Sequence, residues 1–86
     1  MHVSVISPEA TTFDGPADSV VAPAYDGEVG ILPRHAPFMT LLGEGTLVVR
    51  TEGGERRFNV RGGFLQVVED TVRVVTEYVE EESNAA

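Results

Sequence analysis

The sequence predicts a small all-β protein, an antiparallel sandwich of short strands. Short runs rich in Val, Ile, Thr and Phe recur along the chain, separated by Gly, Pro and Asp. The apolar residues show almost no helical periodicity, and the runs are too short and too closely spaced for helices. At 86 residues the chain is long enough for one domain and no more.

The first half of the chain contains a hairpin signal between two apolar runs. Asp26-Gly27 suits the positive φ angles of a tight hairpin turn, and β-branched residues flank it on both sides. The strands that we expect in this half are Val3–Ser7, Ser19–Tyr25, Glu28–Leu32 and a short one at Phe38–Leu42.

Two further hairpins are expected in the second half. Glu52-Gly53-Gly54 separates Gly45–Thr51 from Glu55–Arg61, and Asp70 separates Phe64–Glu69 from Thr71–Tyr78. Alternation of apolar with polar residues in Glu55–Arg61 predicts one buried face and one wet face.

The expected core consists of the apolar residues that alternation places on the inner faces. They are Val5, Val20, Ile31, Val48, Phe58, Val60, Leu65, Val67, Val72 and Val74. Leu47-Val48-Val49 puts apolar side chains on both faces of its strand, which indicates burial on both sides or an outer face covered by another subunit. Most of the six aromatic residues are expected to enter the core.

Composition excludes several classes of function. Fourteen carboxylates against six arginines and no lysine give a net charge of −8, which opposes binding to nucleic acid. The absence of cysteine excludes disulfides and thiolate chemistry. No apolar run approaches the roughly 20 residues of a membrane helix. The N-terminus lacks signal-peptide features, so we expect a soluble protein without direct membrane insertion.

No catalytic, cofactor-binding or metal-binding residue is expected. His35 lies in a Pro-bounded loop, but no second polar group or ligand set accompanies it in the sequence. The Gly pairs lack the Gly-Lys-Ser/Thr ending of a phosphate loop and are interpreted as turns. No serine lies in a Gly-x-Ser-x-Gly elbow, so an enzyme is the weakest hypothesis.

Two separated motifs carry a resemblance to a known family. The first is Asp26-Gly27-Glu28-Val29-Gly30-Ile31-Leu32-Pro33-Arg34-His35-Ala36-Pro37, and the second is Arg61-Gly62-Gly63-Phe64-Leu65-Gln66-Val67. Together with Val3–Glu9 and Phe13-Asp14-Gly15, they resemble the N-terminal β domain of the epsilon subunit of F-type ATP synthase. The resemblance implies the fold of that domain, a flattened antiparallel β-sandwich of about ten short strands. The resemblance implies a short form without the C-terminal helical hairpin, because it runs as far as Glu77 and only nine residues, Tyr78 to Ala86, follow.

This resemblance implies a non-catalytic rotor subunit of the central stalk that couples ion translocation to ATP synthesis. It implies docking on the gamma subunit through Ser7, His35 and Thr40, and on the c-ring through Glu28, Gly27 and Val29. It also implies a peripheral place on the cytoplasmic face of the bacterial inner membrane, and a monomer when isolated. The motif departs from the family at Arg34, where many relatives have glycine.

Domain boundaries follow from the pattern and the charge. We expect the sandwich to span residues 1–78 and residues 79–86 to form a disordered acidic tail, because glutamates crowd the end of the chain. The competing hypothesis is a free-standing β-sandwich that binds a small molecule or carbohydrate. That function would need an exposed aromatic platform.

Overall fold

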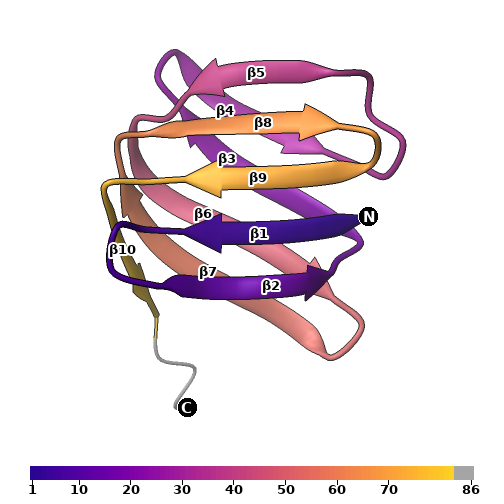
Figure 1. The fold of residues 1–86 in the computed structure, drawn as a ribbon, viewed down its shortest axis with the longest axis horizontal. Coiled ribbons are helices and arrows are strands. Elements are labelled where there is room, and N and C mark those ends of the chain that lie inside the picture. Colours follow the sequence, from indigo (N-terminus) through magenta and orange to yellow (C-terminus); the bar gives the residue numbers. More distant parts are fainter. Residues whose placement is uncertain (83–86) are drawn as a thin grey trace.

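The computed structural model describes residues 1–82 as two five-stranded sheets packed face to face (Figure 1). The first sheet has the order β2 (Thr11–Pro16), β1 (His2–Ile6), β9 (Thr71–Val75), β8 (Phe64–Val68) and β5 (Phe38–Leu41). The second sheet has the order β10 (Tyr78–Glu81), β7 (Gly54–Arg61), β6 (Glu44–Thr51), β3 (Ser19–Ala24) and β4 (Gly27–Ile31). The predicted all-β sandwich is confirmed, and residues 1–82 contain no helix that could cross a membrane.

Strand pairing is antiparallel with one exception. β1 lies between β2 and β9, and it runs parallel to β9, with His2 opposite Thr71 and Ile6 opposite Val75. Strands from the two ends of the described chain therefore lie side by side in the middle of the first sheet (Figure 1).

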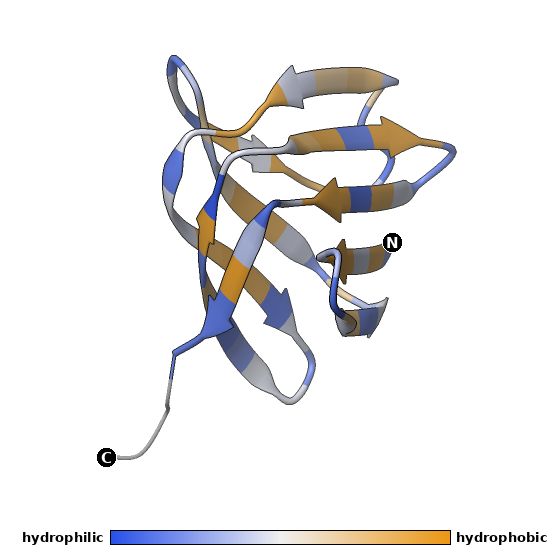
Figure 2. Cartoon of the chain, turned by 60° about the vertical axis from the view of Figure 1, so that its left-hand side comes forward, coloured by the Kyte–Doolittle hydropathy of each residue, from blue (hydrophilic) through white to orange (hydrophobic). Residues whose placement is uncertain are grey.

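The core lies between the two sheets and is made almost entirely of aliphatic side chains. Apolar and polar residues alternate along the strands, as the bands in Figure 2 show. All the predicted core residues are buried except Val48. That prediction was wrong because the flanking residues Leu47 and Val49 face inward, with Leu47 opposite the buried Phe58.

The aromatic residues enter the core less than expected. Only Phe58 is fully buried, while Phe13 and Phe38 are partly buried and pack against the core. Tyr25 is 68% exposed, and Tyr78 is also exposed. Aliphatic side chains, mostly Val and Leu, therefore fill most of the space between the sheets.

The expected strand Thr71–Tyr78 is in fact two strands in different sheets. The chain crosses from β9 to β10 at Thr76, whose buried hydroxyl lies 3.2 Å from the carbonyl oxygen of Arg61 and 2.9 Å from that of Tyr78. Residues 78–81 pair with β7, so the acidic segment expected to be disordered from residue 79 begins as a strand. Residues 83–86 lie outside the described part of the chain.

β2 is the other strand that the sequence pattern did not predict. It forms the edge of the first sheet and includes Asp14, Gly15 and Pro16, which are rare inside strands. Edge strands tolerate such residues because one side of their backbone needs no partner.

Gly63 holds the connection between β7 and β8. Its φ of 98° is unfavourable for L side chains, and a Cβ there would lie 2.0 Å from the carbonyl oxygen of Val75. Only glycine lets the two backbones approach so closely. This explains the second glycine of the Arg-Gly-Gly-Phe motif.

Candidate functional site

The loop between β4 and β5 begins with a tight turn. The backbone N–H of His35 donates to the carbonyl oxygen of Leu32 at 3.2 Å, with Pro33 and Arg34 between them. Arg34 has a φ of 65°. Proline followed by a residue with positive φ is typical of a type II turn, in which glycine normally occupies the second central position. Arg34 therefore adopts a left-handed conformation at a cost of about 1–2 kcal/mol.

His35 is partly buried and held by its own loop. Its Nδ1 atom lies 2.7 Å from the carbonyl oxygen of Ala36, and its ring packs edge-to-face on Phe38 with centroids 5.6 Å apart. Because a carbonyl oxygen can only accept, Nδ1 carries the proton in this arrangement. Within residues 1–82 no group of three or more His, Cys, Asp or Glu side chains could hold a metal ion.

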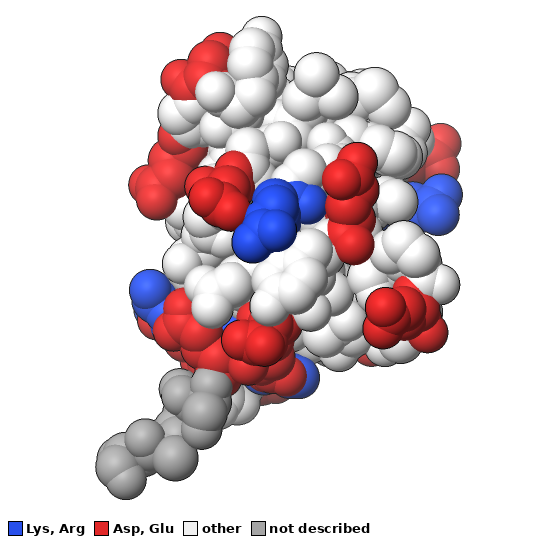
Figure 3. Space-filling model, turned by 90° about the vertical axis from the view of Figure 1, so that its left-hand side faces the viewer, with Lys and Arg blue, Asp and Glu red and all other residues white. Residues whose placement is uncertain are grey.

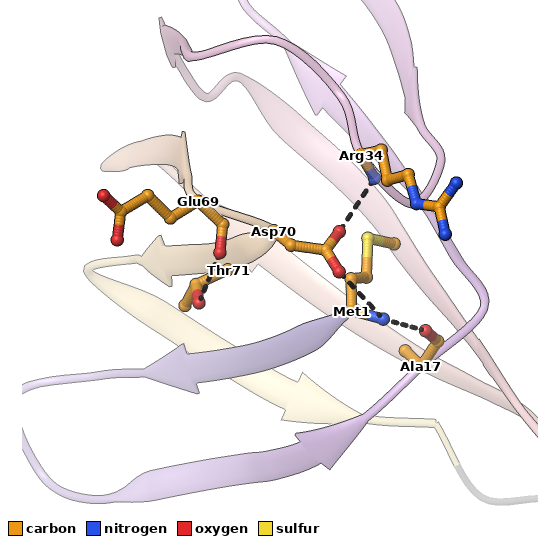
Figure 4. Close-up of polar contacts among 6 residues, drawn as sticks. All are labelled: Met1, Ala17, Arg34, Glu69, Asp70 and Thr71. Atoms are coloured by element: carbon orange, nitrogen blue, oxygen red, sulfur yellow. Dashed lines mark hydrogen bonds and ion pairs between the residues drawn. The ribbon is translucent and has the colours of Figure 1, made fainter.

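Asp70 connects this loop to the rest of the first sheet (Figure 4). Its Oδ1 accepts the backbone N–H of Arg34 at 2.8 Å, and its Oδ2 lies 3.8 Å from the α-ammonium of Met1. That ammonium also donates to the carbonyl oxygen of Ala17 at 3.2 Å. One carboxylate thus contacts two segments that lie far apart in the sequence.

A groove of about 690 Å³ runs between the β3–β4 hairpin and β5, along one edge of the sandwich. The backbone N–H of Tyr25 donates to the carbonyl oxygen of Leu41 at 3.0 Å, which joins the two sheets at this edge. The side chains of Met39 and Leu41 are each 61% exposed, so the groove has an apolar wall. Its lining residues are Ala24, Tyr25, Asp26, Gly27, Glu28, Val29, Phe38, Met39, Thr40 and Leu41.

An apolar row crosses the outer face of the first sheet. Four residues of β1, β9, β8 and β5 are opposite one another in register and point away from the core: Ile6, Val75, Phe64 and Leu41. The inward-facing neighbours Val5, Val74 and Leu65 are fully buried, which fixes the direction of this row. A hollow of about 400 Å³ lies at the β1 end of the row. It is lined by Ile6, Ser7, Pro8, Gly63, Phe64, Val75, Thr76 and Glu77.

Charged side chains do not form a basic surface on the face that Figure 3 shows, where arginines lie next to carboxylates. Arg61 pairs with Glu44 at 2.8 Å, and Arg56 pairs with Glu81. The hydrogen bonds from Arg56 lower the pKa of Glu81. On the opposite sheet, the hydrogen bond from His2 lowers the pKa of Asp14, and a second hydrogen bond from Ser4 adds to this effect.

Residues 1–82 match a family model described as the beta-sandwich domain of the ATP synthase delta/epsilon chain. The chain belongs to this family. It is 42% identical to the ATP synthase epsilon chain of Leptospira borgpetersenii, over 91% of this chain and 61% of that one. It is 37% identical to the epsilon chain of Caulobacter vibrioides, over 94% of each chain.

The fold of this delta/epsilon-type domain also matches solved structures. It superposes with a TM-score of 0.85 on a chain of the Euglena gracilis mitochondrial ATP synthase, in a structure containing OSCP, F1 and the c-ring. The identity is 23%, and the match covers 92% of this chain and 51% of that one. The chain spans about three fifths of the length of the first curated relatives that it matches.

The three residues that the family resemblance suggested for a gamma contact do not lie together in the structure. Ser7 lines the hollow at the β1 end of the apolar row, Thr40 lies in the edge groove, and His35 lies in the loop before β5. Thr40 instead shares the groove with Gly27, Glu28 and Val29, the residues suggested for the c-ring.

The outward-facing residues Phe64, Met39 and Leu41 were not predicted as functional residues from the sequence. The composition of Phe38–Leu41 carries a signal for Met39 and Leu41. All four residues of this strand are apolar or weakly polar, so one apolar face must point away from the core. For Phe64, only the strand pairing decides the direction of the side chain.

Proposed function

We propose that this chain is a non-catalytic epsilon-type subunit of the central stalk of an F-type ATP synthase. It docks on the gamma subunit and on the c-ring, and so couples ion translocation to ATP synthesis. Membership of the delta/epsilon family over residues 1–82 carries this proposal. The proposed location is peripheral, on the cytoplasmic face of the bacterial inner membrane, and the isolated chain is proposed to be a monomer.

The apolar row on the first sheet supplies the gamma-facing surface. Contiguous exposed apolar side chains on a soluble domain mark sites of protein association. Leu41 is the β5 member of the row, the exposed Met39 lies two residues away on the same face of β5, and Ser7 borders the hollow at the other end of the row. A hydrogen-bonded sheet presents these side chains in fixed positions, so little conformational entropy is lost on docking.

The β3–β4 hairpin supplies the proposed c-ring surface. Glu28 and Asp26 are exposed beside its turn, and Gly27 adopts a φ of 133° that lets the chain reverse sharply there. The hairpin is anchored to the core through Val29 and by five paired positions between β3 and β4. Such an anchored tip can transmit torque because it resists bending.

Binding of purified gamma subunit tests the first surface. Leu41→Asp places a charge in the apolar row and should weaken gamma binding by at least about tenfold, or 1.4 kcal/mol. Asn59→Asp is the matched control, because it adds the same charge to the outer face of the second sheet. Equal affinity of both variants and the original chain, measured by calorimetry, would contradict the assignment of the apolar row to gamma.

One observation favours the competing function of a ligand-binding module. Tyr25 is exposed at the rim of the edge groove, where a ring could stack on a sugar or another flat ligand. Shifts of the Tyr25 ring signals on titration with simple sugars would support this function. Unchanged Tyr25 signals, together with measurable binding to gamma, would exclude sugar binding at the groove and support the stalk function.

A further inference from the structure

We propose that Asp70 is a positioning residue that holds the His35 loop in its docking conformation. The proposal rests on the contacts that meet at its carboxylate (Figure 4). Its gamma-binding part also rests on the proposed function, whereas its loop-ordering part can be measured on the isolated chain.

Arg34 has a strained backbone conformation. An L residue at a φ of 65° is less stable than in the ordinary regions, so the turn needs a compensating contact to stay populated. The compensating contact is with Asp70, whose carboxylate accepts the Arg34 backbone N–H at 2.8 Å. A hydrogen bond to a charged acceptor is stronger than one between neutral groups.

Asp70 is itself held by several contacts. Glu69 and Asp70 have φ angles of 49° and 61°, which is the pattern of a two-residue type I′ hairpin turn between β8 and β9. The backbone carbonyl of Asp70 accepts the N–H of His2 at 3.1 Å. The α-ammonium of Met1 lies near Oδ2. Contacts outside the loop therefore hold this carboxylate in the position where it meets the Arg34 backbone.

The turn at Arg34 also positions His35, the proposed docking residue. His35 follows Arg34 directly, and its backbone N–H closes the same turn onto Leu32. If Arg34 leaves the left-handed region, this turn opens and the imidazole loses its place against Phe38. Asp70 thus acts on the proposed gamma contact through the backbone, without touching the partner.

Amide hydrogen exchange of the isolated chain tests the loop-ordering part. Asp70→Gly removes the carboxylate and still permits positive φ, so the Arg34 amide should exchange at least about fivefold faster while the core amides stay protected. Glu69→Gly is the matched control, because it changes the same turn without removing the contact with Arg34. Asp70→Asn keeps a side-chain oxygen acceptor and should restore most of the protection.

Arg34→Gly provides a second test that does not depend on stability. Glycine adopts positive φ without strain, so Asp70→Gly should change the His35–Phe38 ring contact much less in the Arg34→Gly background, as measured by ring-to-ring NMR cross-peaks. Equal effects of Asp70→Gly in the two backgrounds would overturn the proposal. So would unchanged exchange at Arg34 in Asp70→Gly alone.

Affinity for gamma separates this inference from the proposed function. Asp70→Gly should weaken gamma binding by about fivefold to tenfold, and Glu69→Gly should leave it unchanged. If the original chain does not bind gamma, the proposed stalk function is wrong, but the exchange measurements still test whether Asp70 orders the His35 loop. Normal gamma affinity of Asp70→Gly with a disordered loop would overturn the link between Asp70 and docking.

Discussion

Arg56 and Glu81 form a two-point ion pair between β7 and β10, with Nη2–Oε1 and Nε–Oε2 distances of 2.8 and 2.5 Å. The guanidinium also lies 5.1 Å from the centroid of the Phe13 ring, which comes from the edge strand of the other sheet. Arg56 therefore links the last described strand to the margin of the core.

The ion pair predicts a pH-dependent effect of Glu81→Gln. The pKa of Glu81 is lowered in the folded state, so its contribution to stability is present above the unfolded pKa and is lost as pH falls through the folded pKa. At neutral pH the substitution should lower the free energy of unfolding by up to about 1 kcal/mol, as for a partly exposed pair. In urea unfolding measured at neutral and at acidic pH, the deficit should shrink as the pH falls through the folded pKa of Glu81, because the carboxylate then becomes protonated. A deficit that does not change with pH would mean that charge is not the cause, and Glu80→Gln serves as the control.

Phe58→Ala should destabilise the domain by about 3–5 kcal/mol, because its ring is fully buried at the centre of β7 and its loss leaves a cavity. Tyr25→Ala removes an exposed ring and should change stability by less than about 0.5 kcal/mol. Chemical denaturation of both variants makes the comparison. A small effect of Phe58→Ala would mean that the core closes around the missing ring.

Gly63→Ala should lower the free energy of unfolding by more than about 2 kcal/mol. The added Cβ meets the carbonyl oxygen of Val75, and the positive φ adds strain. Gly30→Ala is the control, because nothing lies within 4 Å of a Cβ at that position. Thermal unfolding of the two variants should differ by several degrees. Similar midpoints would show that the β7–β8 connection can shift to admit a methyl group.

Glu28→Ala should weaken coupling while leaving stability almost unchanged, under the proposed c-ring contact. Its side chain is exposed on the edge strand β4, so folding does not depend on it, but a rim carboxylate adds to association. ATP-driven ion pumping by reconstituted membranes makes the measurement, with Glu52→Ala in the β6–β7 turn as the control. Normal pumping by complexes that retain the variant would remove Glu28 from the coupling surface.

The sequence predicted the sandwich and most of its core because alternation and turn residues are local signals. Phe58 and Val60 could be placed from the polar residues between them. Val48 could not be placed in this way, because it lies in an unbroken apolar run. In such a run only the strand pairing shows which side chains face the core. The division of the expected strand Thr71–Tyr78 at Thr76 could not be predicted either. The composition does not change where the chain passes from one sheet to the other.

The candidate site was harder to predict than the fold. The loop could be located from its prolines and His35, and the family resemblance marked Arg34 as a departure from the expected motif. Its contact with Asp70 spans 36 residues of sequence and depends on how the β8–β9 turn aims one carboxylate. No local pattern reports such a contact, because it arises only when the sheet has formed.

The parallel pairing of β1 with β9 affects when the protein can fold during its synthesis. β1 is the first of the described strands to be synthesised, yet one of its two neighbours, β9, is made only after eight of these strands. Until then the buried residues Val3 and Val5 lack their contacts with β9. Contacts between such distant segments slow folding and favour a late, concerted step. Nascent chains halted before Thr71 should therefore remain open to protease, and resistance should arise abruptly once β9 has left the exit tunnel.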